Sequence, residues 1–189
     1  MLVHEDSQQS QGSTMTLMEE RQEIIYFAYG SNLSTRQMLK RCPSSTPIGL
    51  GHLPGWKWII NERGYANIVR DAQSGPKAPA SSGVFGLLYL LPPLDEDSLD
   101  RHEGVPWAYQ KFKLDMSWIK DDQKKDVVGQ DVTALVYIDQ ERVAESAPKE
   151  EYVERMHIGI EDAVENWGLD EQYAEFMRRK LVKKTENSL

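Results

Sequence analysis

The sequence is poor in cysteine and has no long apolar segment, and each deficit argues against a class of protein. Cys42 is the only cysteine among 189 residues, so no disulfide can form within the chain, which is compatible with a reducing compartment. No apolar run approaches the ~18–20 residues of a membrane-spanning helix. The polar N-terminal stretch HEDSQQSQGST lacks the basic and then apolar pattern of a signal peptide. We therefore expect a cytoplasmic protein with no membrane partner.

Basic charge is also scarce. The chain has 22 Lys and Arg against 30 Asp and Glu, a net charge of −8. Because phosphate binding needs a basic face, this balance argues against nucleic acid as a partner. The chain also lacks a glycine-rich phosphate loop of the common nucleotide types. Metal-ligand spacing is missing among the scattered histidines His4, His52, His102 and His157. We expect no metal and no organic cofactor.

Length and composition predict one globular domain. A chain of 189 residues with 40% hydrophobic and 28% charged residues can bury a sizeable core. Residues 1–22 are rich in Ser, Gln and Glu without an apolar pattern, which predicts a disordered tail. The domain is expected over residues 23–185. Within it, the Ser-, Gly-, Pro- and Ala-rich segment Gln73–Ser82 predicts a mobile loop.

Most of the ordered elements read as short strands. The β-branched and aromatic run Ile24–Tyr29, bounded by Gly30, predicts a buried strand. Gly83–Leu91 is almost wholly apolar and predicts a central strand that ends at Pro92. The remaining expected strands are Trp56–Asn61, Tyr65–Arg70, Tyr109–Met116 and Asp131–Asp139.

Helix signals lie in three places. Ser34 with Gln37 has the spacing of a capping box and predicts a helix over Thr35–Arg41 that stops before Pro43. A second short helix is expected over Asp95–Glu103, with Asp95 as its cap and Gly104 as its stop. Two C-terminal helices are expected, one with an apolar face from Tyr152 to Trp167 that Gly168 ends, and one over Leu169–Leu181. Strands at hairpin-like spacing followed by helices indicate an α+β single domain with a mostly antiparallel, barrel-like β-sheet flanked by helices.

The first stretch with chemical potential runs from a strand into a helix start. Its residues are Tyr26, Phe27, Ala28, Tyr29, Gly30, Ser31 and Asn32. Such a junction exposes backbone N–H groups that can hold a carboxylate or a developing oxyanion. Gly30 lets the backbone approach a ligand closely, and Ser31 adds a hydroxyl. The alternative interpretation is an ordinary strand–turn–helix junction.

The second stretch is Leu99–Val105, in which Glu103 closes the expected short helix before Gly104. At a helix C-terminus the dipole disfavours a negative charge, and burial acts in the same direction, so both would raise the pKa of Glu103. A carboxyl group with a raised pKa suits a residue that both accepts and donates a proton. The alternative is a solvated carboxylate on a charged helix. His102 is interpreted as a surface histidine and Cys42 as a packed thiol.

Together the two stretches resemble the γ-glutamylcyclotransferase family. Tyr26–Leu33 looks like its N-terminal substrate-binding signature, and Leu99–Val105 looks like the segment that holds its catalytic glutamate. A third stretch, Glu145–Pro148 leading through Tyr152, is similar to the family's C-terminal part. The resemblance extends from about Tyr26 to about Leu181. The tetrad is Tyr-Gly-Ser-Asn and not the Tyr-Gly-Ser-Leu of glutathione-specific relatives, which favours γ-glutamyl amino acids as substrates.

The resemblance implies release of 5-oxoproline from a small γ-glutamyl substrate, with Glu103 as general acid and base. It also implies that Tyr29–Ser31 hold the substrate, and Tyr109 and Tyr137 are either pocket phenols or structural residues. Two alternatives stay open: a cyclotransferase for another amide, such as a γ-glutamylamine or a γ-glutamylated secondary metabolite, and a non-catalytic small-molecule-binding module. Both a monomer and a homodimer are compatible with the sequence.

Overall fold

The computed structural model describes residues 21–73 and 82–182. The expected loop Gln73–Ser82 lies outside these residues except at its two ends, and so does the expected tail except for Arg21 and Gln22. The side chain of Arg21 forms ion pairs with Glu96 and Asp97, at 3.0 and 2.8 Å.

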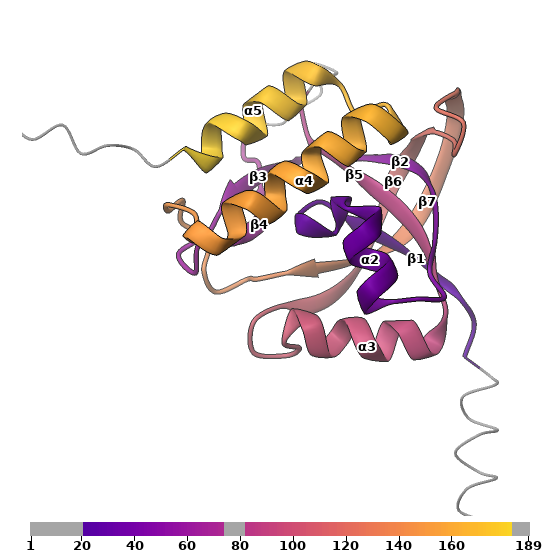
Figure 1. The fold of residues 1–189 in the computed structure, drawn as a ribbon, viewed down its shortest axis with the longest axis horizontal. Coiled ribbons are helices and arrows are strands. Elements are labelled where there is room, and N and C mark those ends of the chain that lie inside the picture. Colours follow the sequence, from indigo (N-terminus) through magenta and orange to yellow (C-terminus); the bar gives the residue numbers. More distant parts are fainter. Residues whose placement is uncertain (1–20, 74–81, 183–189) are drawn as a thin grey trace, which may run out of the picture.

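The core of the fold is a closed five-stranded barrel (Figure 1). Around the barrel the strands are β1 (Ile24–Ala28), β5 (Val84–Leu91), β2 (Thr46–Leu53), β6 (Gln110–Lys120) and β7 (Asp126–Ile138). Neighbouring strands are antiparallel, except that β7 closes the barrel by pairing parallel to β1. A separate antiparallel pair consists of β3 (Trp56–Ile60) and β4 (Ala66–Arg70). This α+β, mostly antiparallel barrel confirms the predicted fold class.

Strand β2 is an element that sequence patterns did not predict. It contains Pro47, Gly49 and Gly51, which are residue types that weaken strand signals. A bulge lies between Pro47 and Gly49, where the pairing to β5 shifts its register. Gly49 has φ +147°, and a Cβ there would lie 2.0 Å from the carbonyl oxygen of Lys120. Glycine is therefore needed where β2 approaches Lys120. Because glycine is uncommon inside strands, its presence hides the strand pattern in the sequence.

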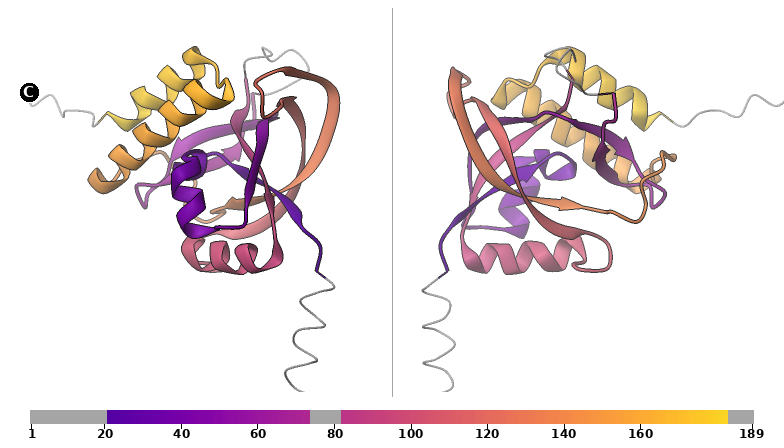
Figure 2. Two further views of the ribbon diagram at one scale, coloured as in Figure 1. Left: turned by 45° about the vertical axis from the view of Figure 1, so that its right-hand side comes forward. Right: turned by 180° about the vertical axis from the view of Figure 1, so that it is seen from behind.

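The helices flank the barrel (Figures 1 and 2). Helices α4 and α5 pack together on one side of the barrel, whereas α3 crosses the opposite end. Among the described residues, no helix combines the length and the apolar character needed to cross a membrane. The helical elements are a 3₁₀ turn η1 (Ser31–Leu33), α2 (Thr35–Arg41), α3 (Pro93–Glu103), α4 (Glu150–Trp167) and α5 (Glu171–Leu181).

The start of α3 corrects one prediction. Asp95 is not the cap, because the helix begins earlier, with Pro92 at the cap position and Pro93 as its first residue. Proline fits the first helical turn, where its missing N–H is not needed. Asp95 is buried instead, and its Oδ2 accepts a hydrogen bond from the backbone N–H of Ser44 at 2.7 Å. Asp95 therefore connects α3 to the loop that follows α2.

Only one of the two hydrogen bonds of the predicted capping box is present at the start of α2. Ser34 Oγ accepts a hydrogen bond from the backbone N–H of Gln37 at 3.2 Å. The Gln37 side chain does not return to Ser34, however, and donates to Ser31 Oγ at 2.9 Å and to Asn32 Oδ1 at 2.8 Å. Tertiary contacts therefore redirect this side chain from the helix cap to the turn η1.

Replacing Ser34 by Ala is expected to lower the free energy of unfolding by about 1 kcal/mol, because the N–H of Gln37 loses its acceptor. Thermal unfolding should show a fall in Tm of about 2–4 °C. Ser34→Thr, which keeps an acceptor hydroxyl, is the control. An alanine variant that melts with the wild type would show that the cap contributes nothing to stability.

Candidate active site

A cavity of about 240 Å³ lies beside the turn η1, between the end of α3, strand β4 and helix α4. Of the predicted site residues, those that line it are Tyr26, Phe27, Tyr29, Gly30, Ser31, Asn32, Glu103, Tyr109 and Tyr137. Ala28 does not line the cavity: it is fully buried at the end of β1, paired with Leu87 of β5, and belongs to the core. The fold therefore brings together two stretches that lie about seventy residues apart in the sequence.

Glu103 is the last residue of α3, and its side chain is 16% exposed. Gly104 follows with φ +65°, the left-handed conformation that ends the helix and turns the chain away. Burial raises the pKa of the Glu103 carboxyl above its ordinary value, although Arg41, Arg155, the Asn32 hydrogen bond and Arg63 act in the opposite direction. The cavity thus holds a carboxyl group whose protonated form is stabilised relative to water.

Asn32 connects Glu103 to the rest of the site. Its Nδ2 donates to Glu103 Oε1 at 3.1 Å and to the Tyr26 hydroxyl at 3.0 Å. Its Oδ1 accepts from Gln37 Nε2 at 2.8 Å and from Arg41 Nη1 at 3.1 Å. Because both ends of the buried amide are engaged, Asn32 can hold the carboxyl group of Glu103 in one orientation.

The turn at Gly30 is tight because of its neighbours. Gly30 has φ −116°, so it is not in the left-handed conformation that favours glycine. A Cβ at this position would lie 2.9 Å from the Tyr152 hydroxyl and 3.2 Å from the Cβ of Ala66. The next backbone N–H, that of Ser31, donates to the same Tyr152 hydroxyl at a long 3.3 Å. Glycine therefore keeps this part of the cavity wall open.

Tyr109 and Tyr137 line the cavity, and their hydroxyl groups also donate hydrogen bonds to other residues of the protein. The Tyr109 hydroxyl donates to the carbonyl of Ala66 at 2.8 Å, and the Tyr137 hydroxyl donates to Asp100 Oδ1 at 2.7 Å. Tyr29 donates in turn to the carbonyl of Tyr137 at 2.5 Å. Burial raises the pKa of all three tyrosines. These tyrosines are uncharged near neutral pH, and each hydroxyl group donates its hydrogen bond to another residue of the protein.

The cationic groups of the cavity were not predicted from the sequence. Arg41, Arg63 and Arg155 all line it, from α2, the β3–β4 turn and α4. Arg155 donates to Ser31 Oγ at 3.0 Å and pairs with Glu151 at 3.2 Å. No local pattern separates these arginines from those on the surface. The only available signal is helical spacing, which puts Arg155 one turn after Tyr152 on α4.

Side chains of His, Cys, Asp and Glu can bind a metal ion, and a cysteine thiol can act as a nucleophile. Residues 21–73 and 82–182 contain no group of three or more His, Cys, Asp or Glu side chains that could hold a metal ion. Cys42 is buried, and its Sγ donates to the carbonyl of Asp95 at 3.4 Å. Burial raises the pKa of this thiol to about 12. A thiol with such a pKa is not a nucleophile near neutral pH.

A family model matches most of the chain, including nearly all residues of the barrel and the residues that line the cavity. The family model described as "Gamma-glutamyl cyclotransferase, AIG2-like" matches residues 26–155. The chain therefore belongs to the AIG2-like gamma-glutamyl cyclotransferase family. The matched segment begins at Tyr26 and ends at Arg155, two residues that line the cavity.

Solved structures support the same fold. One named gamma-glutamyl cyclotransferase is 22% identical with a TM-score of 0.66, and the alignment covers 88% of this chain and 92% of that one. An uncharacterised protein from Homo sapiens is 22% identical with a TM-score of 0.66, covering 89% and 92%. YkqA from Bacillus subtilis is 20% identical with a TM-score of 0.63, and the chain spans 58% of its length. At these identities the likeness establishes the fold alone. No curated protein sequence matches the chain with significance.

Proposed function

We propose that this protein is a γ-glutamylcyclotransferase, which converts a γ-glutamyl amino acid or a related γ-glutamyl amide into 5-oxoproline and the free amine. The observation that carries the proposal is the position of Glu103. It is a largely buried carboxyl group with a raised pKa, it faces a cavity, and it is oriented by Asn32. Such a group is suited to transfer protons within a small-molecule site.

The reaction needs no nucleophile from the protein, because the substrate carries its own. Glu103 takes a proton from the α-ammonium of the substrate, and the freed amine attacks the γ-carbonyl carbon. A new C–N bond closes the five-membered ring, and the electron pair of the carbonyl moves to its oxygen. When the tetrahedral intermediate collapses, the bond to the leaving nitrogen breaks, and Glu103 returns the proton to that nitrogen. The ring nitrogen then gives up its second proton, which the released amine takes up, so the products are 5-oxoproline and the ammonium form of the amine.

The turn Tyr29–Ser31 is the proposed binder of the substrate's charge. Backbone N–H groups at such a turn can hold a carboxylate or an oxyanion, and one well-placed donor is worth about 3–4 kcal/mol in the transition state. The N–H of Ser31 makes only a 3.3 Å bond to Tyr152, which a stronger acceptor can replace. The cavity also folds the γ-glutamyl chain so that its ends meet, and this proximity lowers the barrier further.

The test is release of 5-oxoproline from a panel of γ-glutamyl compounds, with the amine measured in parallel. We expect turnover of γ-glutamyl amino acids, in equal amounts of the two products and unaffected by a chelator. A panel without any 5-oxoproline would overturn the proposal. Activity lost in EDTA and restored by a divalent ion would require another mechanism.

Arg41 is expected to influence the pH at which kcat/KM rises on the acidic side of its profile. Its Nη1 lies 3.9 Å from Glu103 Oε1 and lowers the pKa of that carboxyl. In Arg41→Met this attraction is lost, so the pKa of Glu103 rises further. Since the ionised form is the base, the acidic limb of the kcat/KM profile should move to higher pH. Arg41→Lys, which keeps a positive charge, should move it less, and an unmoved limb in both variants would contradict the role of Glu103 as base.

A further inference from the structure

Arg63 differs from the other two cavity arginines because it has no carboxylate partner among the described residues. Arg41 faces Glu103, and Arg155 is paired with Glu151. For Arg63, no Asp or Glu oxygen lies within 4.0 Å in the part of the chain that the structure describes. Within residues 21–73 and 82–182, the half-buried Arg63 guanidinium has one acceptor, the carbonyl of Ala108, at a long 3.4 Å.

Two aromatic faces hold the Arg63 guanidinium at the cavity. Its central carbon lies 5.4 Å from the ring centre of Tyr65 and 5.5 Å from that of Tyr109, and both rings line the cavity. Cation–π contacts orient a guanidinium without neutralising its charge. Arg63 therefore has a fixed position at the cavity, and N–H groups of its guanidinium can still donate hydrogen bonds to a ligand.

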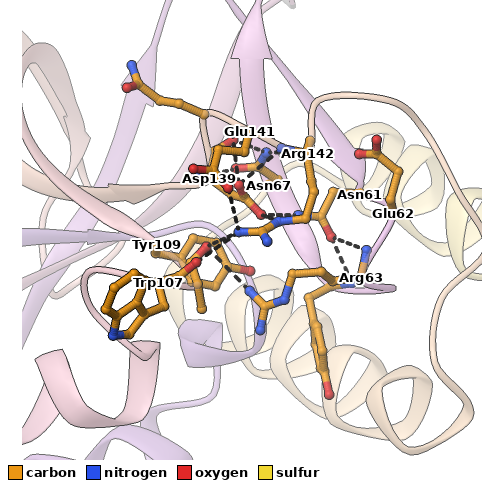
Figure 3. A network of polar contacts seen from close by, with 12 residues as sticks. Asn61, Glu62, Arg63, Asn67, Trp107, Tyr109, Asp139, Glu141 and Arg142 are labelled. Atoms are coloured by element: carbon orange, nitrogen blue, oxygen red, sulfur yellow. Dashed lines mark hydrogen bonds and ion pairs between the residues drawn. The ribbon is translucent and has the colours of Figure 1, made fainter.

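A buried network fixes the turn that carries Arg63 (Figure 3). Asn61 Oδ1 accepts from the backbone N–H of Arg63 at 3.1 Å, and Asn61 Nδ2 donates to the fully buried Asp139 at 3.0 Å. Asp139 also pairs with Arg142 at 2.6 Å, and Arg142 donates to the carbonyl of Trp107 at 2.9 Å. The network joins the Arg63 turn to the loop that follows Glu103, so both sides of the cavity keep their spacing.

The charge balance of the cavity favours an anionic ligand. Three arginines and one glutamate line it, in a protein of net charge −8. Arg41 Nη1 lies 3.9 Å from Glu103 Oε1, and Arg155 donates to Ser31 Oγ at 3.0 Å. Arg63 makes neither contact and lies in the β3–β4 turn, beside the rings of Tyr65 and Tyr109. A γ-glutamyl amino acid carries two carboxylates, one beside the attacking amine and one on the leaving group. The carboxylate of the leaving group would then contact Arg63.

We propose that Arg63 is a specificity-determining residue that binds the carboxylate of the leaving amino acid. This inference rests on the proposed cyclotransferase function and adds its preferred substrate class: γ-glutamyl compounds whose leaving amine bears a carboxylate. A guanidinium matches a carboxylate in planar, two-pronged geometry, which an uncharged leaving amine cannot offer.

The experiment compares γ-glutamyl-alanine with γ-glutamyl-alaninamide, which differ only in that carboxylate. The ratio of their kcat/KM values is measured for the wild type and for Arg63→Gln, and dividing one ratio by the other cancels the intrinsic reactivity of the two leaving amines. We expect this quotient to be about tenfold or more, arising in the KM for γ-glutamyl-alanine. Arg63→Lys should restore part of it. Arg70→Gln is the matched control, since Arg70 stacks on Trp56 at 4.2 Å and does not line the cavity.

A quotient near one would overturn the inference, whether Arg63→Gln leaves both substrates unchanged or weakens both alike. In that case 5-oxoproline release by the wild type would leave the proposed function standing. If the wild type released no 5-oxoproline from either compound, the proposed function would fail and this inference with it.

Discussion

Replacing Glu103 by Gln is expected to lower kcat by about 10²–10⁴-fold or more, because the amide cannot carry the proton between the two nitrogens. Gln matches the shape of Glu and can still accept the hydrogen bond from Asn32. Binding of 5-oxoproline should therefore stay close to that of the wild type. A Gln variant that retains more than about a tenth of wild-type activity would contradict the assignment of Glu103 as acid and base.

The same variant makes a stability prediction that separates lost chemistry from lost folding. Burial raises the pKa of Glu103 above its ordinary value of 4.5. A carboxyl group that holds its proton more tightly when folded contributes stability below that pH, and this contribution is lost as the pH rises through the raised pKa. Gln has no such loss. Glu103→Gln should therefore melt above the wild type at neutral pH, and the difference should shrink below pH 4.5. A variant that melts lower at neutral pH would show that the ionised carboxylate is stabilised by its arginines.

Substituting Gly30 by Val is expected to lower kcat/KM by about 10²-fold or more, since it displaces the proposed donors at the turn. The reason is space: the first atom of the new side chain would lie 2.9 Å from the Tyr152 hydroxyl and 3.2 Å from the Cβ of Ala66. The branches would have to occupy the cavity or displace Tyr152, which holds the N–H of Ser31. Because φ at Gly30 is −116°, the substitution does not place valine in a left-handed conformation.

Melting temperature and ligand binding must be measured together for Gly30→Val. Our account predicts a loss of 5-oxoproline binding much larger than the loss of stability, and Gly30→Ala should lie between the variant and the wild type. If Gly30→Val melts far below the wild type yet binds normally at a temperature where it is folded, the turn is structural and the proposed substrate position is wrong.

Much of the fold was predictable because its signals are local. Ser34 at the start of α2 and the left-handed Gly104 and Gly168 at the ends of α3 and α4 were each readable from a few adjacent residues. Strand β2 was not predictable in this way. Its glycine at position 49 is required by a contact with Lys120, which lies in another strand.

The candidate site likewise contains residues that local sequence patterns indicate and residues whose role depends on the tertiary fold. Glu103 and the Tyr26–Asn32 stretch were proposed because they resemble two segments of a family, and all of these residues except Ala28 line the cavity. The arginines were missed because their meaning depends on where the fold puts them. Arg63 gains its meaning from a turn that Asn61 and Asp139 hold in place, and these two residues are 78 positions apart. Sequence reasoning left open whether Tyr109 is a pocket or a structural residue, and the geometry gives both answers, since it lines the cavity while donating to Ala66.

The most direct test of the central claim is the identity of the product formed from γ-glutamyl-alanine in water enriched in heavy oxygen. If the substrate's own amine attacks the γ-carbonyl, mass spectrometry will find 5-oxoproline without heavy oxygen, in an amount equal to the alanine released. If water is the nucleophile, the product will be glutamate that carries one heavy oxygen atom. Unlabelled 5-oxoproline is the result that our account predicts, and labelled glutamate would contradict it.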